Sequence, residues 1–327
     1  MKIIMTGGSG FIGRNIIKSL LQNNHTILAP ARNKDSFPFK QPVADFYPLN
    51  GLFYEDSMIE HYHRFDPEII LHLAALRGEG QGSLNDYYQV NVQSTQKLIE
   101  FALQQQVKLF IYFSTVGVHG TIPAKLPAGV QSPINPDSVY HITKYEGEKL
   151  VERKLKHRIP YLIIRPTITY GPGDNGFLYK LIDLVHRTRF PLIRKDILIH
   201  LLNVETISRF VNTAIEKPVF QDKEFILADH SPVKLHDLVS TIYTHFYNRT
   251  YPSFLKVPGF LYTVGEKTTA ILHWTGLNIS LKLLSHSWFY DTGYLQKYFS
   301  DPLSDTLTSV KAYLEDGSWG EHSDARK

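Results

Sequence analysis

Three side chains suited to one proton transfer occur in order along the chain: Thr115, Tyr140 and Lys144. A tyrosine can take the hydroxyl proton while a hydride leaves a carbinol carbon for a nicotinamide, provided that its pKa falls. Ionising a phenol of pKa near 10 at pH 7 requires about 4 kcal/mol, so a nearby cation must supply much of it. Lys144 lies one helical turn after Tyr140, on the same helix face, where it can also bond a ribose hydroxyl. We expect Thr115 to hold the substrate oxygen.

A glycine-rich turn near residue 7 supports the interpretation that these residues act with a nicotinamide. An apolar run from Lys2 to Thr6 predicts a buried strand, and Phe11 to Leu21 has helical periodicity. Between them, Gly7 and Gly10 allow the backbone to approach a pyrophosphate, and Gly13 allows close helix packing. Glycines at this spacing also serve as plain tight turns, and Tyr-x-x-x-Lys is a short motif. The ordered combination of the two predicts a nicotinamide-dependent enzyme.

Composition excludes several other classes. The 327 residues are 43% hydrophobic and include no cysteine, which excludes disulfides and thiolate chemistry. A net charge of +4 with scattered basic residues argues against a nucleic-acid partner, and His61 and His63 lack further ligands for a metal. No apolar run of roughly 18 residues and no signal-peptide pattern is present, so we expect a soluble cytoplasmic protein with no membrane partner.

Alternating strand and helix patterns predict an α/β fold, a Rossmann-type doubly wound parallel sheet with a smaller, interleaved C-terminal substrate lobe. We expect a dinucleotide-binding domain over 1–170, rejoined by late strands from about 198–230. The substrate lobe covers mainly 171–316, and a polar tail with a lone Trp319 covers 317–327. The expected strands are Lys2 to Thr6, Thr26 to Ala29, Glu68 to Leu73, Lys108 to Ser114, Tyr161 to Arg165 and Glu224 to Ala228.

Further motifs follow in an order that is typical of one family. They are His72-Leu73-Ala74-Ala75, Asn91-Val92, Phe113-Ser114-Thr115, Val118-His119-Gly120, Tyr140-x-x-x-Lys144 with Glu148, Arg165-Pro166 and Tyr170-Gly171-Pro172. With the glycine turn, they make the whole chain resemble an extended short-chain dehydrogenase/reductase, the family of NAD-dependent epimerases and dehydratases.

The resemblance implies a role for each matching position. Cofactor contacts would come from Gly7, Gly10, Phe11, Ile12, Gly13, Leu73, Ala74, Ala75, Ser114, Tyr140, Lys144 and Pro166. Substrate contacts would come from Ser83, Thr115, Asn175 and Arg209. Asn91 would brace the central strands or a water, and the helices Asn91 to Gln105 and Tyr140 to Lys156 would form the four-helix bundle of a homodimer.

Departures from the family pattern narrow the reaction. Sugar 4,6-dehydratases of this family carry an Asp-Glu pair where this chain has Val116 and Gly117, and related decarboxylases carry a glutamate at the second of these places. Without these carboxylates or a substitute, elimination lacks its acid and base, so we predict that the protein is not a dehydratase. Epimerase/reductases of the fucose-synthase type use a cysteine, which is absent. Keto-sugar reduction and C4 epimerisation remain.

The predicted cofactor is NADP(H) rather than NAD(H). The second strand ends in Ala31-Arg32, with Lys34 beyond, where NAD enzymes usually carry an acidic residue. A guanidinium suits a 2′-phosphate, although Arg32 also fits a solvated surface position.

The sequence does not decide between two classes of substrate. Two arginines with which nucleotide-sugar epimerases hold a diphosphate are not matched: Arg194 is displaced, and 283–290 has no arginine, although Arg209 or Lys180 could compensate. A nucleotide sugar is the first expectation. The aromatic and leucine-rich stretch from Tyr251 to Phe299 also suits a hydroxysteroid-dehydrogenase-like or aldehyde-reductase-like enzyme on an apolar carbonyl. A non-catalytic NADP(H) sensor is the alternative outside enzymes.

Overall fold

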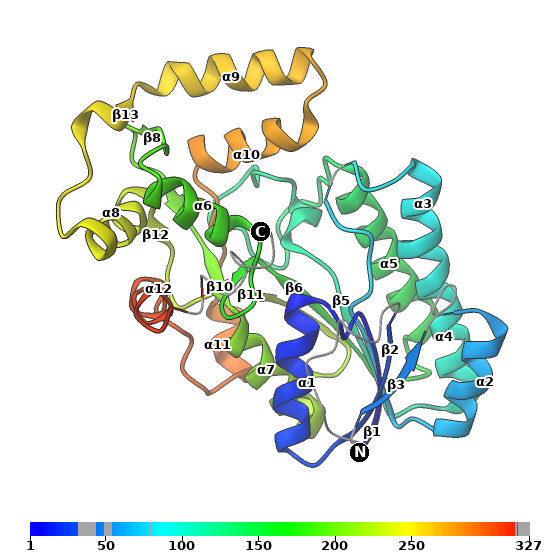
Figure 1. Ribbon diagram of the computed structural model, residues 1–327. Coiled ribbons are helices and arrows are strands. Elements are labelled where there is room, and N and C mark those ends of the chain that lie inside the picture. Colours follow the sequence, from blue (N-terminus) through cyan, green and yellow to red (C-terminus); the bar gives the residue numbers. More distant parts are fainter. Residues whose placement is uncertain (32–43, 49–53, 79, 318, 320–327) are drawn as a thin grey trace.

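The core of the fold is one parallel sheet, which confirms the predicted fold class. The computed structural model describes residues 1–31, 44–48, 54–78, 80–317 and 319 (Figure 1). Seven strands lie in the order β11-β6-β5-β4-β1-β2-β3. Their bounds are β1 Lys2–Thr6, β2 Thr26–Ala31, β3 Ala44–Pro48, β4 Ile69–His72, β5 Leu109–Phe113, β6 Tyr161–Pro166 and β11 Lys223–Leu227. Six of these match the expected strands within two residues at either end; the edge strand β3 was not predicted.

The order of the strands reverses beside β1. The chain runs from β1 outward to β2 and β3, and then returns to place β4 on the other side of β1. In such sheets a crevice opens at the carboxyl ends of the strands where the order reverses, and ligands bind there. The topology therefore places the glycine turn after β1 next to the segment that follows β4.

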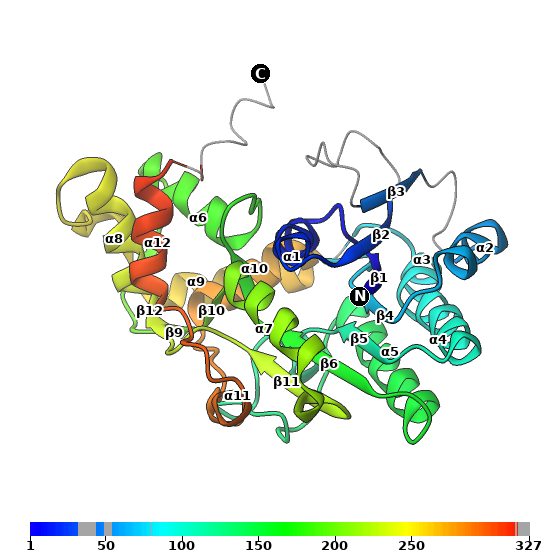
Figure 2. The same cartoon turned by 90° about the horizontal axis from the view of Figure 1, so that it is seen from below.

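Two helical layers cover the sheet (Figure 2). On one face lie α1 Phe11–Gln22, α7 Val204–Glu216 and α11 Gly293–Tyr298; on the other lie α2 Asp56–Phe65, α4 Ser94–Gln105 and α5 Val139–Leu155. The alternation of strand side chains explains the two layers, since Ile3 and Met5 pack with the α1 side while Ile4 packs with the α2 and α4 side. A short helix α3 Leu84–Tyr88 and a π-helical turn η2 Gln89–Gln93 lead into α4.

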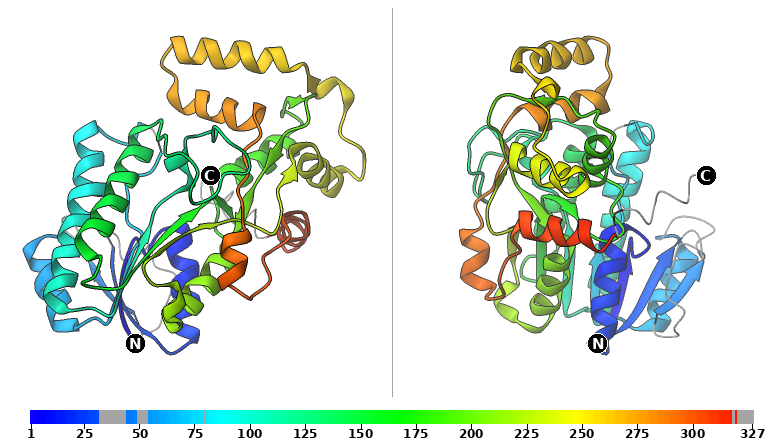
Figure 3. Two further views of the ribbon diagram at one scale, coloured as in Figure 1. Left: turned by 180° about the vertical axis from the view of Figure 1, so that it is seen from behind. Right: turned by 60° about the vertical axis from the view of Figure 1, so that its left-hand side comes forward.

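The C-terminal lobe has its own apolar core around α6 Phe177–His186, α8 Leu235–Tyr247 and α12 Thr306–Glu315. A helical hairpin of α9 Gly259–Ile271 and α10 Thr275–Ser285 stands out from this lobe (Figure 3). Of the described residues, no helix combines the length and apolar character needed to cross a membrane.

The late segment returns to the sheet only in part. β11 joins β6, and α7 and α11 cover the sheet, but the other short strands pair outside it. These are β7 Ile168–Tyr170 with β10 Leu201–Asn203, β9 Leu198–Ile199 with β12 Val233–Lys234, and β8 Leu192–Ile193 with β13 Lys256–Val257. Single helical turns η3 Val116–His119, η4 Pro218–Phe220 and η5 Ser253–Leu255 complete the described elements. Trp319 packs edge-on against His186 and Phe246, whereas the rest of the expected tail from 318 onward lies outside the described residues.

Candidate active site

A cavity of about 420 Å³ lies beyond the carboxyl ends of β5 and β6. The sheet side contributes the segments that follow these strands, and the C-terminal lobe closes the cavity through α6, α10 and the segment before α11. Its walls include five of the predicted site residues: Ile12, Ser114, Thr115, Tyr140 and Pro166. The cavity therefore joins the first turn of α1 to Thr115 and Tyr140, whereas Lys144 does not line it.

Thr115 stands two residues beyond β5 and caps the following helical turn η3. Its Oγ1 accepts a hydrogen bond of 3.1 Å from the Gly117 N–H, so the hydroxyl can still donate its proton to a substrate oxygen. The neighbouring Ser114 hydroxyl is buried and has no hydrogen-bond partner within the part of the chain that the structure describes. Two hydroxyls thus face the end of the cavity where a carbonyl or carbinol oxygen has to be held.

Tyr140 and Lys144 lie near the start of α5, as their spacing predicts, but their ionisation differs from the expectation. Loss of solvent around Tyr140 raises the pKa of its hydroxyl to about 12, which the charge of Arg77 offsets only in part. Burial lowers the pKa of the Lys144 ammonium to about 7, against the opposing effect of Glu148. Low solvation disfavours both charged forms, so without a ligand Lys144 does not bring the pKa of Tyr140 below its ordinary value.

The position of α5 is set by close contact with the sheet. A Cβ on Gly147 would lie 2.0 Å from the Tyr112 hydroxyl oxygen, so only glycine lets the helix come this near to β5. The Tyr112 hydroxyl donates to the Lys144 carbonyl at 3.2 Å, and the Lys144 Nζ lies 4.1 Å from the centre of the Tyr112 ring. Lys144 is thus held between its helix and an aromatic ring of the sheet.

Asn91 braces α5 from the other side. Its Oδ1 accepts from the Leu76 N–H at 2.7 Å, and its Nδ2 donates to the Leu76 carbonyl at 3.1 Å and to the Thr143 Oγ1 at 3.0 Å. This buried amide ties the segment after β4 to the helix residue next to Lys144. The resemblance implied that Asn91 braces the central strands or a water, whereas its side chain here bonds the segment after β4 and the helix α5.

A buried histidine at the end of β4, His72, helps to fix the segment that follows this strand. His72 Nδ1 lies 2.7 Å from Thr6 Oγ1, and Nε2 lies 2.9 Å from Thr95 Oγ1. Because the Thr95 hydroxyl donates to the Asn91 carbonyl, Nε2 carries the imidazole proton and Nδ1 accepts from Thr6. Burial, with the charge of Lys144, holds the pKa of His72 well below its usual value, so the ring is neutral. The motif was expected as a strand end; its role in this hydrogen-bonded chain was not predicted.

The glycine turn has the close geometry that a dinucleotide requires. A Cβ on Gly7 would lie 2.7 Å from the Ala74 nitrogen, and one on Gly13 would lie 2.3 Å from the Gly7 carbonyl oxygen. Gly10 caps α1 without a side-chain hydrogen bond, and the first turn, which begins with Phe11 and Ile12, has no acidic residue. The free N–H groups of this helix end suit a pyrophosphate, and so these residues fit the predicted cofactor.

Several predicted residues lie elsewhere. Ser83 is exposed and caps α3, where its hydroxyl and Asp86 form a capping box. Arg209 lies on α7 and donates to the Pro302 carbonyl at 2.9 Å, and Asn175 is exposed between two residues of the cavity wall without belonging to it. Leu73, Ala74 and Ala75 follow β4 beside the glycine turn, but they too lie outside this cavity wall. Arg32 and Lys34 lie outside the described residues.

Three polar residues of the cavity region were not predicted: Arg77, Asp137 and His141. Arg77 and His141 belong to the wall, and the His141 Nδ1 lies 2.9 Å from the Asp137 carboxylate. The His141 ring covers Gly117, because a Cβ on that glycine would lie 2.2 Å from His141 Nε2. Adjacent helix residues point in different directions, so the position of His141 next to Tyr140 gave no reason to expect both in one cavity.

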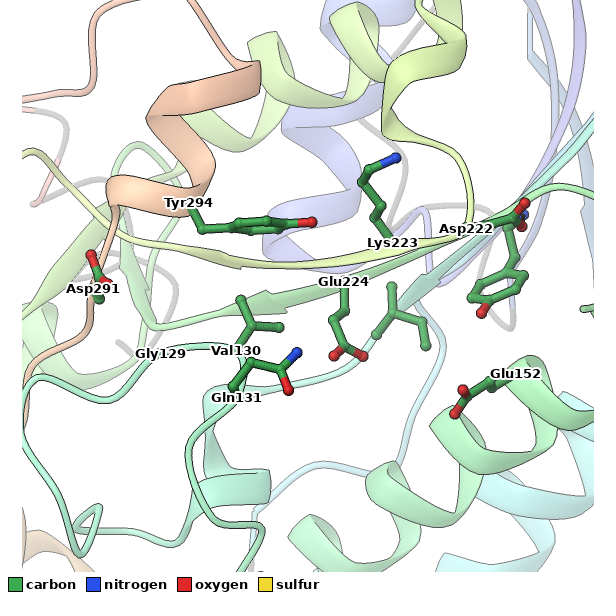
Figure 4. A pocket seen from close by; sticks show the side chains of 11 residues that line it. Gly129, Val130, Gln131, Glu152, Asp222, Lys223, Glu224, Asp291 and Tyr294 are labelled. Atoms are coloured by element: carbon green, nitrogen blue, oxygen red, sulfur yellow. Dashed lines mark hydrogen bonds between the residues drawn. The ribbon is translucent and has the colours of Figure 1, made fainter.

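A second hollow of about 410 Å³ lies beside the starts of β6 and β11 (Figure 4). Its wall includes one lysine, Lys223, and four carboxylates, those of Glu152, Asp222, Glu224 and Asp291. It contains none of the predicted site residues, and it borders the first halves of the strands rather than their carboxyl ends. The predicted site residues that line a cavity therefore gather around Tyr140 and not in this hollow.

Fold and cavity together define a nicotinamide-dependent enzyme of the short-chain dehydrogenase/reductase type. Residues 3–199 match the sequence profile of the NAD dependent epimerase/dehydratase family, and the chain belongs to this family.

Individual relatives cover different chemistries. The chain is similar to a UDP-glucose 4-epimerase of Vibrio cholerae, 28% identical over 72% of this chain and 73% of that protein. It is also similar to a 4-hydroxy-2-methyl-3-oxo-4-farnesyl-3,4-dihydroquinoline-1-oxide ketoreductase of Stigmatella aurantiaca, 25% identical over 58% of this chain and 57% of that protein. The matches thus span between 57% and 73% of these relatives' own length. The crystal structure of UDP-glucuronic acid 4-epimerase from Bacillus cereus in complex with NAD has a TM-score of 0.77, with 18% identity over 98% of this chain and 97% of that one, which shows a shared fold.

Proposed function

We propose that this protein oxidises or reduces a secondary alcohol or ketone of a nucleotide sugar, by keto-sugar reduction or C4 epimerisation. One observation carries the proposal: Thr115 and Tyr140 line one cavity with the first turn of α1, and Lys144 lies buried one helical turn from Tyr140. When bound, the nicotinamide accepts or returns the hydride. Every other step falls to the protein's own side chains.

The Tyr140 hydroxyl exchanges the proton with the substrate oxygen, and Thr115 donates a hydrogen bond to the same oxygen. In the direction of ketone reduction, the high pKa of Tyr140 suits a proton donor, since the phenol stays protonated at neutral pH. Lys144 can regain its full charge when it gains a hydrogen-bond acceptor in the cavity, and this charge then favours the tyrosinate in the oxidative direction. The charge state of this acid/base pair thus depends on whether the site is filled.

Two features support a nucleotide sugar. The chain is 28% identical to a protein named as a UDP-glucose 4-epimerase over about three quarters of its length, and Arg77 provides a cation at the cavity wall. The departures at Val116 and Gly117 favour redox chemistry or epimerisation over elimination, and the exclusion of dehydratase activity stays a prediction, since the family includes both reactions by name.

The test is turnover of a sugar panel with two matched tyrosine variants. Purified protein is assayed with UDP-glucose, UDP-galactose and UDP-4-keto sugars in the presence of each dinucleotide. We expect Tyr140→Phe to lose activity, whereas Tyr145→Phe, on the same helix but outside the cavity wall, retains it. Equal turnover by the Tyr140→Phe variant and the wild type would refute the assignment. No wild-type turnover of any sugar would refute the substrate class.

We further propose NADP(H) as the cofactor. The proposal rests on Ala31-Arg32 at the end of β2, where Ala31 is described and Arg32 is not. The dinucleotide released on denaturation, identified by mass spectrometry, tests it together with an Ala31→Asp/Arg32→Ala double variant. Stoichiometric NAD release, or a double variant with unchanged preference, would contradict the proposal.

An apolar carbonyl compound is the second candidate substrate. Ile279, Leu283 and Trp288 form an apolar part of the cavity wall, and the chain is 25% identical to a protein named as a ketoreductase of a farnesylated quinoline oxide. Reduction of long-chain 3-oxo compounds with no turnover of any sugar nucleotide would favour this candidate. Dinucleotide binding without turnover of either panel would favour a sensor.

We also propose a homodimer formed through α4 and α5, which pack against each other along one edge of the molecule. The molar mass in solution, measured by light scattering, tests it. An Ile142→Glu variant probes the interface, since Ile142 is exposed on α5.

A further inference from the structure

The cavity wall contains a histidine, His141, that the proposed reaction does not use, and the Asp137 carboxylate is bonded to it. The Asp137 carboxylate accepts from His141 Nδ1 at 2.9 Å and from both the N–H and the hydroxyl of Thr121 at 3.0 Å each. With Nδ1 protonated toward Asp137, His141 Nε2 keeps a lone pair. That edge of the ring lies over Gly117, in the cavity wall next to Thr115 and Tyr140.

The place that the histidine fills is informative. Gly117 is the position at which the dehydratases and decarboxylases that the chain resembles carry a glutamate, and here no side chain could fit. A Cβ at 117 would lie 2.2 Å from His141 Nε2 and Cδ2. The imidazole therefore occupies the space that a side chain at position 117 would need, and it comes from α5 rather than from the segment after β5.

We propose that His141, oriented by Asp137, is a second acid/base of this site, which exchanges a proton with the carbon next to the one that Tyr140 oxidises. The proposal rests on the proposed function, since that carbon becomes acidic only when its neighbour is a ketone. A second acid/base is also the substitute whose absence led us to predict that the protein is not a dehydratase, so that prediction holds only if this proposal fails.

The step balances within the site. His141 Nε2 takes the proton from the carbon, the C–H electron pair becomes the C=C bond of an enolate, and the ketone oxygen takes the negative charge beside the Thr115 and Tyr140 hydroxyls. Asp137 stabilises the imidazolium through the hydrogen bond to Nδ1. Return of the proton to the same carbon restores the ketone with no change of oxidation state.

Other ionisable groups lie in the same cavity wall or next to it. Asp137 and Tyr140 lie on its own helix or just before it, Arg77 and Asp174 come from the segments after β4 and β7, and Tyr290 comes from the segment before α11. Burial alone would raise the pKa of the Asp137 carboxyl, but the hydrogen bonds from His141 and Thr121 bring it below its usual value. Asp137 is thus a stable carboxylate partner for an imidazolium.

The experiment follows deuterium and hydride in one reaction. UDP-glucose and UDP-galactose are incubated with dinucleotide and protein in D₂O, and mass spectrometry measures carbon-bound deuterium in the recovered sugars against the hydride transferred. We expect the wild type to incorporate deuterium. His141→Gln should lower the ratio of deuterium to hydride by about 100-fold, the usual range for loss of a general base, and Asp137→Asn should lower it by about 10-fold. His119→Gln, another buried histidine after β5, should keep the wild-type ratio.

The outcomes are distinguishable. Hydride transfer without deuterium incorporation, or an unchanged ratio in His141→Gln, overturns the second acid/base and leaves the proposed function standing. Absence of hydride transfer with every sugar overturns the proposed function and this inference with it. The ratio corrects for partial loss of folded protein, and Asp137→Asn gives a second, independent variant.

An independent observation concerns the outer surface of the hairpin α9–α10. Half of the exposed large apolar side chains of the described residues lie between 254 and 277. They include Phe254, Phe260, Val264, Ile271, Trp274 and Leu277, which are 81%, 64%, 56%, 76%, 57% and 49% exposed. An apolar surface of this kind marks an interaction site.

The charges beside it favour one partner. Between 252 and 287 the sequence has three lysines and one carboxylate, Glu266. That carboxylate accepts from the Ser285 hydroxyl and lies 3.6 Å from His286 Nδ1, so its charge is engaged within the hairpin. Exposed Phe, Trp and Ile bordered by positive charge suit the surface of an anionic bilayer. We infer that the hairpin docks on such a surface, although the sequence alone predicted no membrane partner.

Flotation with vesicles tests the inference. The full protein should float with vesicles containing 30% phosphatidylserine and less with pure phosphatidylcholine. Ile271→Glu should reduce the bound fraction by at least about 10-fold, because it places a charge in the apolar contact. Leu184→Glu, an exposed leucine on α6, is the control and should bind as the wild type does. If Ile271→Glu floats as the wild type does, the membrane contact lies on another surface of the protein. If the wild type does not float but self-associates, and Ile271→Glu abolishes this association, the hairpin binds a second copy of the chain. Either result overturns the proposed docking of the hairpin on a bilayer.

Discussion

Lys144 should destabilise the ligand-free protein in a manner that depends on pH. Its ammonium is buried under the Tyr112 ring, and burial lowers its pKa to about 7 from 10.5. Between these two values the folded protein binds fewer protons than the unfolded chain does. The free energy of unfolding therefore rises with pH across this window, whereas below pH 7 the unfavourable contribution is at its largest and nearly constant.

The magnitude follows from the two pKa values. Raising the pH from 7 to 9 should remove about 2 kcal/mol of the destabilisation, because the folded form is almost fully neutral at pH 9 while the unfolded chain still keeps its proton. Lys144→Met keeps the length of the side chain and removes the ionisation. We expect the variant to be more stable than the wild type at pH 7, and the difference to narrow by about 2 kcal/mol at pH 9.

The assay is urea unfolding of both proteins at pH 6, 7, 8 and 9, freed of bound dinucleotide, since a ligand would add its own stabilisation. Comparing the two at each pH cancels groups that titrate alike in both. The lowered pKa of Lys144 would be refuted if the difference in free energy of unfolding between the two proteins stayed constant from pH 7 to 9. It would also be refuted if the variant were less stable than the wild type at every pH.

Three further outcomes follow from the geometry. Tyr140→Phe should lower kcat by at least about 100-fold with normal dinucleotide binding, measured by turnover and calorimetry, because it removes only the exchanging proton; a fall in binding alone would contradict it. Gly13→Ala should weaken dinucleotide binding at least tenfold, since its Cβ would lie 2.3 Å from a backbone oxygen. Gly276→Ala, which has open space around it, should bind the dinucleotide normally, and equal affinities of the two variants would contradict the close turn. Glu148→Gln should lower the free energy of unfolding by about 3 kcal/mol, because it breaks the buried pair with Arg165 at 2.7 Å, and a change below about 0.5 kcal/mol would show that the pair contributes little.

The fold could be predicted because its signals are local. Short apolar runs between amphipathic segments gave the buried strands, and the glycine spacing gave the turn between β1 and α1. The edge strand β3, which has five residues, was not predicted. The short strand pairs of the C-terminal lobe escaped prediction because a strand of two or three residues has no period to detect. Their existence depends on partners far away in the sequence, such as β8 with β13.

The composition of the site could be predicted better than its electrostatics. Thr115, Tyr140 and Lys144 carry a spacing that the sequence displays, whereas their ionisation depends on how much water the surrounding segments remove. His141 was missed for a related reason. Its position over Gly117 results from the way the segment after β5 folds back against the start of α5, and the spacing along the chain does not record that approach.

The same burial that prepares the site opposes its charge. Glu148, one turn beyond Lys144, would be the natural counter-ion, but Arg165 holds both of its carboxylate oxygens at 2.9 and 2.7 Å. Lys144 is therefore left near the midpoint of its titration, where a modest stabilisation from a ligand shifts its protonation strongly. With a tyrosine that stays protonated and a lysine that is only partly charged at pH 7, the tyrosinate is unfavourable in the empty site. The free energy of unfolding that Lys144→Met should add is therefore the stability that the protein loses by keeping a buried lysine whose protonation changes when a ligand binds.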